Sequence, residues 1–267
     1  MAAEVTIASC KDILGAMRQL KERLVQAGKP RAEVSLMRFW YRGHGCYDWA
    51  LTPSGLREPF PGTSGLLQTM LHEFRAEATI IHRTPPPHSD TRQWVFLMRH
   101  YEMPTFLIDW TRSPLAALFF AVESSHGTDD QDAALWVLRP GVWNKRMMPE
   151  SVQGGRDRLY EAYSKELDDL FGVHFEMGCL RPSSGMAGQI AAIEPIYNSS
   201  RMIAQQSVFT IHGLASDPME KRHEQFEEAC LWKWRIHAKS KPDLSTAPQK
   251  LGAELLVKPA AYDRACW

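Results

Sequence analysis

The chain is poor in cysteine, and its cysteines lack the spacings that make cross-links or metal sites. It has five, at Cys10, Cys46, Cys179, Cys230 and Cys266, with no C-x-x-C pair among them. A disulfide framework uses an even number of cysteines, and a structural zinc site uses closely spaced pairs. We therefore expect reduced thiols, no structural zinc and a cytoplasmic location.

Long hydrophobic runs and an excess of one charge are also missing. The longest apolar run, Leu115–Val122, is far shorter than the roughly 20 residues that span a bilayer. The N-terminus lacks the basic, apolar and cleavage-site pattern of a secretion signal. Lys+Arg and Asp+Glu both number 31, so no global field attracts nucleic acid or a membrane, although a local basic groove stays open. These absences predict a soluble cytoplasmic protein with no membrane partner.

Motifs of several large enzyme classes are absent as well. The sequence has no G-x-x-x-x-G-K-[ST], no G-x-G-x-x-G after a strand, no H-E-x-x-H and no G-x-S-x-G. Nucleotide-hydrolase, Rossmann, zincin and lipase functions therefore have no support. The ten histidines show no metal-ligand spacing, so we expect no metal cofactor.

What is present has an ordinary globular balance, with 44% hydrophobic and 23% charged residues. Periodicity predicts an α+β protein forming one domain over residues 1–267, with a helical insertion at about 142–195 whose role is not assigned. Helices are expected from Ser9 to Gly28, from Ser64 to Ile81, over Thr91–Glu102, from Ser113 through Val122, over Arg156–Phe171 and over Glu220–Ala229. Strands are expected at Val34–Tyr41, Cys46–Leu51, Thr105–Asp109, Ala133–Leu138, Ser207–His212, Cys230–His237 and Glu254–Lys258, and a polar loop at Lys239–Gln249.

Polar side chains gather around the expected strand Thr105–Asp109. Ser113 followed by Pro114 is a strong helix start, because serine accepts an orphan N–H and proline has none. For one residue alone a structural role carries more weight: Asp109 as a helix cap, or His100 as a satisfied core histidine. For the set, a binding site is favoured, since loops at strand ends commonly carry function. The set is His100, Tyr101, Asp109, Trp110, Thr111 and Ser113.

An arginine and a glycine, Arg42 and Gly43, directly follow the expected strand Val34–Tyr41. A period of two places Trp40 and Arg42 on one face of that strand. A buried guanidinium needs an anionic partner. That partner is either a carboxylate, at Asp48 or Asp109, or the phosphate of a ligand, and the sequence leaves both open.

Four groups of residues resemble the FRG domain family, which is named for a Phe-Arg-Gly triplet. The first three are Tyr41-Arg42-Gly43, with Tyr41 in place of the Phe, then Trp49-x-Leu51-x-Pro53-Ser54-x-x-Arg57, then His100-Tyr101-x-x-Pro104-Thr105-x-Leu107-x-Asp109-Trp110-Thr111-x-x-Pro114. The fourth is Arg201-x-Ile203-x-x-Gln206-x-x-Phe209-Thr210. The resemblance covers roughly residues 35–140 and 198–212.

The resemblance implies an ADP-ribosyltransferase-like fold, with two small, mostly antiparallel sheets forming an NAD cleft flanked by helices. It implies that Arg42, Gly43 and the helix start at Ser113 hold the diphosphate of NAD. Thr111 would lie in the strand-to-helix turn, and Tyr101 or Trp110 would pack on the nicotinamide.

The catalytic residues implied by the resemblance are His100, Asp109 and Gln206. Gln206 stands where the family fold has a glutamate, and its amide stabilises a developing positive charge less than a carboxylate does. Asp109 is then the best alternative carboxylate, and either His100 or Asp109 would take the proton of the acceptor.

The function implied is an NAD-dependent ADP-ribosyltransferase toxin, used in bacterial toxin–antitoxin systems or phage defence and neutralised by an antitoxin or chaperone. RNA is preferred over protein as the acceptor, because the Trp-rich strand Cys230–His237 carries Lys233 and Arg235, and stacking with cationic contacts suits single strands. A protein-targeting transferase, a non-catalytic nucleotide or phage-component sensor, and an NAD glycohydrolase are the alternatives.

Overall fold

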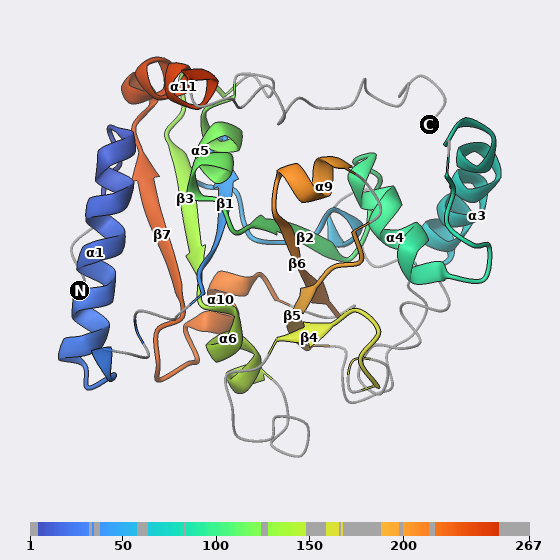
Figure 1. The fold of residues 1–267 in the computed structure, drawn as a ribbon, viewed down its shortest axis with the longest axis horizontal. Helices are drawn as coiled ribbons and strands as arrows, with labels where there is room; N and C mark the ends of the chain where they lie inside the picture. The colour runs from blue at the N-terminus through green and yellow to red at the C-terminus, as the bar shows by residue number, and fades with distance from the viewer. Residues whose placement is uncertain are drawn as a thin grey trace. The chain divides into compact units, whose positions relative to one another are not determined.

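The computed structural model describes residues 5–31, 34, 38–57, 64–82, 84–123, 128–147, 159–165, 167, 188–197, 200–213 and 217–250. Within these ranges the protein is α+β, as the periodicity predicts. The expectation of two small sheets is wrong, because the strands form one sheet of seven in the order β4-β5-β6-β2-β1-β3-β7 (Figure 1). Strands β4 and β5 are parallel, whereas β1–β2, β1–β3, β3–β7 and β5–β6 are antiparallel. Hydrophobic period identifies a strand and its buried face but not its partner, which is why the number of sheets was not predictable.

The strands and helices have the following bounds. The strands are β1 Trp40–His44, β2 Leu107–Thr111, β3 Ala133–Leu138, β4 Tyr160–Glu161, β5 Ile190–Glu194, β6 Ser207–His212 and β7 Leu231–Ile236. The α-helices are α1 Cys10–Gln26, α3 Ser64–Ile81, α4 Thr91–His100, α5 Pro114–Val122, α6 Pro140–Met147, α9 Ser200–Ala204, α10 Met219–His223 and α11 Lys241–Lys250; short 3-10 helices are η1 Ser54–Leu56 and η3 Ala238–Ser240. No helix of the described ranges is long and apolar enough to cross a bilayer.

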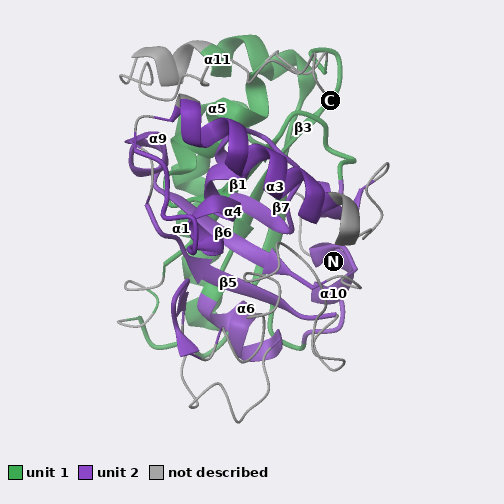
Figure 2. Ribbon diagram, turned by 90° about the vertical axis from the view of Figure 1, so that its right-hand side faces the viewer, with its two compact units in different colours: residues 1–49, 110–140, 227–256 green, residues 50–109, 141–226, 257–267 purple. Residues whose placement is uncertain are grey.

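The chain divides into two compact units, coloured separately in Figure 2. Unit 1 contains residues 1–49, 110–140 and 227–256, and unit 2 contains residues 50–109, 141–226 and 257–267. The division falls inside β2, between Asp109 and Trp110. Unit 1 therefore holds β1, β3 and β7 with α1, α5, α11 and η3, and unit 2 holds β4, β5 and β6 with the remaining helices.

In unit 1, one face of the sheet is covered by helices. Its core joins residues of α1, α5 and α11 to the inward positions of the strands, among them Tyr41, Leu135 and Trp234. Gly43 lies on this face, where an added Cβ would stand 2.0 Å from the carbonyl oxygen of Ala117 and 2.5 Å from the amide nitrogen of Ala121. A glycine at this position is what lets α5 lie directly on β1.

In unit 2, the core between α3 and α4 is built from the apolar stripe that the sequence shows at helical spacing. Leu67, Phe74 and Ala78 of α3 meet Trp94 and Leu97 of α4. The ring of Phe74 packs edge-on against Trp94 at 6.2 Å between centroids. This packing places the last turn of α4, which carries three polar or aromatic residues of the candidate site.

Helix starts were predicted well. The capping box at Ser9, the cap at Asp90 and the Ser113-Pro114 start are all confirmed. These signals are local, because a cap bonds to a backbone N–H two or three residues away. The strands Ala133–Leu138 and Ser207–His212 are confirmed at both ends, and Cys230–His237 contains β7.

Several expected boundaries are wrong. The first strand is Trp40–His44 rather than Val34–Tyr41, and Val34 is helical. The strand expected at Thr105–Asp109 is shifted by two residues to Leu107–Thr111, and Cys46–Leu51 is not a strand. Both strand shifts follow from pairing, since β1 and β2 extend only where Tyr41 faces Thr111 and Arg42 faces Trp136.

Of four further expectations, three are wrong and one falls outside the described residues. The polar loop expected at Lys239–Gln249 is mostly helix α11, whose Pro242 is tolerated because it sits in the first turn. Tyr160–Glu161 is strand β4 inside the helix expected at Arg156–Phe171, and β5 was not anticipated. The helix expected at Glu220–Ala229 is only Met219–His223. The expected edge strand Glu254–Lys258 lies outside the described residues.

Candidate functional site

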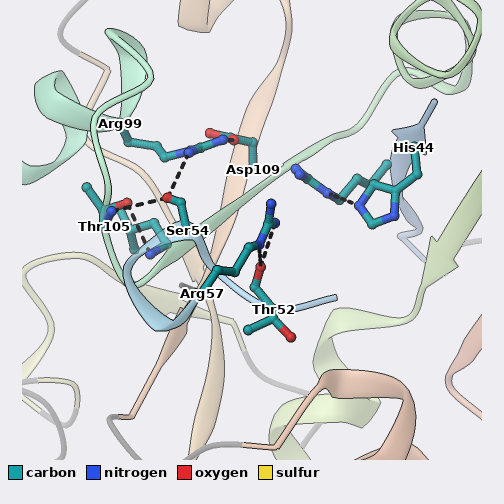
Figure 3. Close-up of polar contacts among 9 residues, drawn as sticks. His44, Thr52, Ser54, Arg57, Arg99, Thr105 and Asp109 are labelled. Carbon is teal, nitrogen blue, oxygen red and sulfur yellow. Dashed lines mark hydrogen bonds and ion pairs between the residues drawn. The ribbon is translucent and has the colours of Figure 1, made fainter. Parts of the chain in front are cut away.

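Arg42 lies within β1, not after it, and its guanidinium is held by a neighbour on the same strand. Its Nε–H donates to Nε2 of His44 at 2.9 Å, the contact that ends at His44 in Figure 3. Positions i and i+2 of a strand point to one face, so β1 itself sets this contact. Because the guanidinium is planar, this bond at Nε also fixes the orientation of its two terminal nitrogens relative to the strand.

His44 is buried, and both of its ring nitrogens face donors. Besides Arg42, the indole Nε1–H of Trp136 points at Nδ1 of His44 at 3.3 Å. A neutral imidazole has one lone pair, so it fully accepts only one of these two bonds. The rings of Trp49 and Trp136 also stand edge-on to His44, at 6.1 and 6.3 Å between centroids. An acceptor offered to Arg42 by a ligand would relieve this competition.

The register of unit 1 places a second cation, Lys233, on the same face of the sheet as Arg42, the face away from the helices. Arg42 of β1 pairs with Trp136 of β3, and Trp136 pairs with Lys233 of β7. The Lys233 Nζ lies 4.0 Å from the ring centroid of Tyr47 and 4.8 Å from that of Trp136. Trp136 thus lies between two cations in one cross-strand row.

The alternation expected for Cys230–His237 is confirmed by the rest of β7. Trp232, Trp234 and Ile236 pack in or against the core of unit 1, and Lys233 and Arg235 lie on the other face. The Arg235 guanidinium stacks 3.7 Å from the Tyr47 ring centroid and pairs with Asp132 at 3.0 Å. This face combines cations with aromatic rings, the combination that binds nucleotides.

The strand-to-helix turn after β2 uses its polar atoms locally. The Thr111 hydroxyl oxygen accepts the Ser113 N–H at 2.9 Å, and the Ser113 hydroxyl oxygen accepts the Ala116 N–H at 3.3 Å. Trp110 is only 2% exposed. The turn expected to support NAD is therefore also the cap that starts α5.

In unit 2, Asp109 forms an ion pair with an arginine that sequence reasoning did not single out. Nε of Arg99 donates to Oδ2 of Asp109 at 2.6 Å, and Nη2 of Arg99 contacts the same oxygen. The side chains are 17% and 37% exposed, respectively. Burial alone would lower the pKa of Arg99, but the charge and hydrogen bond of Asp109 outweigh it and raise that pKa. The available signal was that a carboxylate on a mostly buried strand needs a cation nearby.

The ion pair is anchored to a loop through Ser54. Nη1 of Arg99 and the backbone N–H of Thr105 both donate to the Ser54 hydroxyl oxygen, at 3.4 and 3.3 Å (Figure 3). Asp109 thus stands in a polar cluster of unit 2 that includes two residues of the Trp49–Arg57 motif region, Ser54 and Arg57.

His100 and Tyr101 end α4 side by side, with their rings edge-on at 5.3 Å. Burial, followed by the charge of Arg201, lowers the pKa of His100 to about 4. His100 is therefore neutral at pH 7 and can accept a proton. Tyr101 also packs against Phe74 at 5.8 Å, as part of the α3–α4 core.

Gln206 immediately precedes β6 in a left-handed conformation, with φ of 49°. Its N–H donates to the carbonyl of Ile203 at 3.0 Å, which closes a turn after α9. Gln206 is exposed. Non-glycine residues at positive φ are uncommon and are often found at functional positions.

No group of three or more His, Cys, Asp or Glu side chains that could hold a metal is found in the part of the chain that the structure describes. Cys10, Cys46 and Cys230 are free thiols, and the other two cysteines lie outside the described ranges.

The fold defines an α+β protein on a single mixed sheet, and comparison adds the family. Residues 37–130 match the family model described as FRG domain, so this part of the chain is an FRG domain. The matched range contains β1, β2, α3, α4 and α5, and with them both Arg42–His44 and Arg99–Asp109. No curated protein and no solved structure matches the chain.

Proposed function

We propose that the chain is an NAD-dependent ADP-ribosyltransferase toxin that modifies a macromolecule, with RNA as the preferred acceptor, in a toxin–antitoxin system or in phage defence. The observation that carries this proposal is Arg42, an arginine oriented by His44 within a strand of the FRG domain. A guanidinium is the side chain that best matches phosphate oxygens, and a pre-oriented one loses less entropy on binding.

The residues of unit 1 fit the substrate's chemistry. Arg42 would pair with the diphosphate of NAD. Gly43 follows Arg42 on β1, and Ser113 starts α5 shortly after β2, the strand that pairs with β1. An aromatic ring is required beside the nicotinamide. Of the candidates from the sequence, Trp110 lies in unit 1 and would have to become exposed to serve.

The reaction proposed is substitution at the ribose carbon that carries nicotinamide. The bond from that carbon to the nicotinamide nitrogen breaks, and nicotinamide leaves with the electron pair. A bond forms from the same carbon to an oxygen or nitrogen of the acceptor, whose proton passes to a base. His100 is the proposed base because its imidazole is neutral at pH 7 and Asp109 is already engaged by Arg99; its lowered pKa makes it a weaker base than an exposed histidine.

RNA is preferred as acceptor because of β7. Lys233 and Arg235 lie on the Tyr47 ring, and cations beside aromatic rings are suited to single-stranded nucleic acid. A toxin of this kind requires a neutralising partner, so expression of the chain alone is expected to arrest growth. Normal growth at full expression would count against the toxin proposal.

A second function, a non-catalytic nucleotide-sensing module, is favoured by two observations. Gln206 offers an amide instead of a carboxylate, and the carboxylate of Asp109 is paired with Arg99. Neither group is then well placed to stabilise positive charge on a ribose.

One experiment separates these functions. Purified protein is incubated with NAD labelled in the adenylate half, together with cell RNA and cell protein. Label on RNA is the expected result; label on protein, free ADP-ribose or no turnover identifies the protein-modifying transferase, the glycohydrolase or the binding module, respectively. The variant Arg42→Ala serves as the inactive control, and Arg23→Gln, on the exposed side of α1, as the matched active control.

A further inference from the structure

The loop from Thr52 to Arg57 in unit 2 is held rigidly against Thr105. The N–H of Gly55 donates to the Thr105 carbonyl at 2.9 Å, and the N–H of Arg57 donates to the Ser54 carbonyl at 3.2 Å within the short helix η1. A Cβ at Gly55 would lie 3.0 Å from the carbonyl carbon and oxygen of Thr105. Glycine thus permits a close approach that fixes the side chains on either side of it.

Arg57 is exposed, yet one edge of its guanidinium is fixed to the backbone. Its Nε and Nη2 donate to the Thr52 carbonyl oxygen at 2.8 and 2.6 Å (Figure 3). The two N–H groups of Nη1 and the second N–H of Nη2 have no acceptor among the residues that the structure describes. No carboxylate in those ranges pairs with Arg57 either. The pre-oriented outer edge of this guanidinium is therefore available to an anion.

The Ser54 hydroxyl adds a further donor beside Arg57. Its oxygen already accepts two bonds, from Arg99 Nη1 and from the Thr105 N–H. Its lone pairs are thus occupied, and its hydrogen has no acceptor in the described part of the chain. A hydroxyl in this state is a donor that lacks an acceptor.

Two guanidinium groups, those of Arg57 and Arg99, lie near Ser54. The negative charges of Asp109 and Glu102 both act on Arg99, and Asp109 pairs with it directly. Partial burial of the guanidinium, followed by the positive charge of Arg99, lowers the pKa of Arg57. Two guanidinium groups are therefore near enough to repel each other, and a bound anion would relieve that repulsion.

We propose that Arg57, Ser54 and Arg99 form a binding site for the phosphate group of a nucleotide or nucleic acid. A phosphate presents several oxygens, so it can accept a forked pair of bonds from Arg57 and a third from Ser54, with Arg99 supplying charge. A carboxylate has only two oxygens and uses fewer of these donors. The site involves none of the residues assigned to NAD binding in unit 1, and it requires no ADP-ribosyl transfer.

Two phosphate sources are tested separately with the full chain. One probe is ADP, measured by isothermal titration calorimetry, and the other is a single-stranded RNA oligomer without terminal phosphates, measured by fluorescence anisotropy. Arg57→Gln is expected to weaken binding of at least one probe by roughly tenfold or more, the usual effect of losing a hydrogen-bonded charge. Arg57→Lys keeps the charge without the fork and should be intermediate, and Ser54→Ala should weaken binding less than Arg57→Gln. Arg23→Gln, which removes an equal charge from α1, should bind like the wild type.

The outcomes are decisive in each direction. A loss confined to ADP assigns the phosphate of a free nucleotide, and a loss for RNA assigns a backbone phosphodiester; both support the site. Equal affinities of the wild type and Arg57→Gln for both probes would overturn it, as would a wild type that binds neither. Melting curves show whether each variant is folded. If Arg57→Gln is unfolded, Ser54→Ala tests the site in its place. A chain that binds ADP through Arg57 but never transfers label would keep this site and refute the transferase.

Discussion

The ion pair between Arg99 and Asp109 makes the most direct test of what Asp109 does. Asp109→Asn preserves the shape of the side chain and removes its charge, and so leaves the 17%-exposed Arg99 without its anion. Breaking a buried pair costs about 3–5 kcal/mol, whereas exposed pairs contribute about 0–1 kcal/mol. Because Asp109 is 37% exposed, solvent screens part of this cost. We therefore expect Asp109→Asn to lower the free energy of unfolding by about 1.5–3 kcal/mol.

That loss converts to a measurable shift in melting temperature. At about 2–4 °C per kcal/mol for chains near this size, Asp109→Asn should lower the Tm by roughly 3–12 °C. The assay is circular dichroism melting, with the single variants Asp109→Asn and Arg99→Met and their double variant. If the two side chains stabilise each other, the double variant should lose clearly less than the sum of the two single losses. Asp217→Asn, an exposed carboxylate of unit 2, is the matched control and should stay within about 0.5 kcal/mol.

The reasoning is refuted if Asp109→Asn melts like the wild type. If the variant also loses label transfer from NAD while keeping its Tm, Asp109 acts in the chemistry and not in the framework. If stability and NAD affinity fall together, its role is to hold Arg99 and the Ser54 loop in place, which is the result that the geometry favours.

Three other predictions concern single residues. Arg42→Ala should abolish NAD binding in calorimetry and leave the circular dichroism spectrum unchanged, and an unfolded variant would instead show a framework role. Gly43→Ala should give little folded protein, because its Cβ would stand 2.0 Å from the carbonyl of Ala117; soluble variant with a wild-type Tm would contradict this packing. Burial keeps the pKa of folded His100 at about 4, below the 6.5 of an exposed histidine, so the unfolded chain binds a proton that the folded chain does not. The free energy of unfolding should therefore fall as the pH drops from about 6.5 to 4, and urea titrations of His100→Gln should lack this component.

Features that depend on near neighbours in the chain were determined by the sequence. The caps at Ser9, Asp90 and Ser113 are confirmed because a cap and the N–H it accepts are three residues apart. The faces of β7 are confirmed because alternation is a property of any strand, whatever its partner. The FRG motifs that lie within residues 37–130 were also readable, since their residues and order are in the sequence itself; the group Arg201–Thr210 lies outside the matched range.

The candidate site was only partly predictable for the opposite reason. Arg42 was singled out from its position after an apolar strand, but its contact with His44 required the strand to run three residues further than expected. Arg99 was missed because nothing in the spacing of ten residues to Asp109 indicates an ion pair until α4 has turned back onto β2. Arg57 was seen as a motif residue, but not as a donor fixed by the Thr52 carbonyl.

Only the tertiary structure decided which strands meet and which charges pair. A strand's period is the same whether it lies in one sheet or two, so the single sheet of seven strands could not be read from the pattern. Helix α11 was hidden by its polar composition, and Lys241 at its start is buried through bonds to the carbonyls of Gly45 and Thr128, both more than a hundred residues earlier. Local bonding sets the elements because its partners are adjacent in the chain, whereas sheet order and ion pairs depend on partners that only folding brings together.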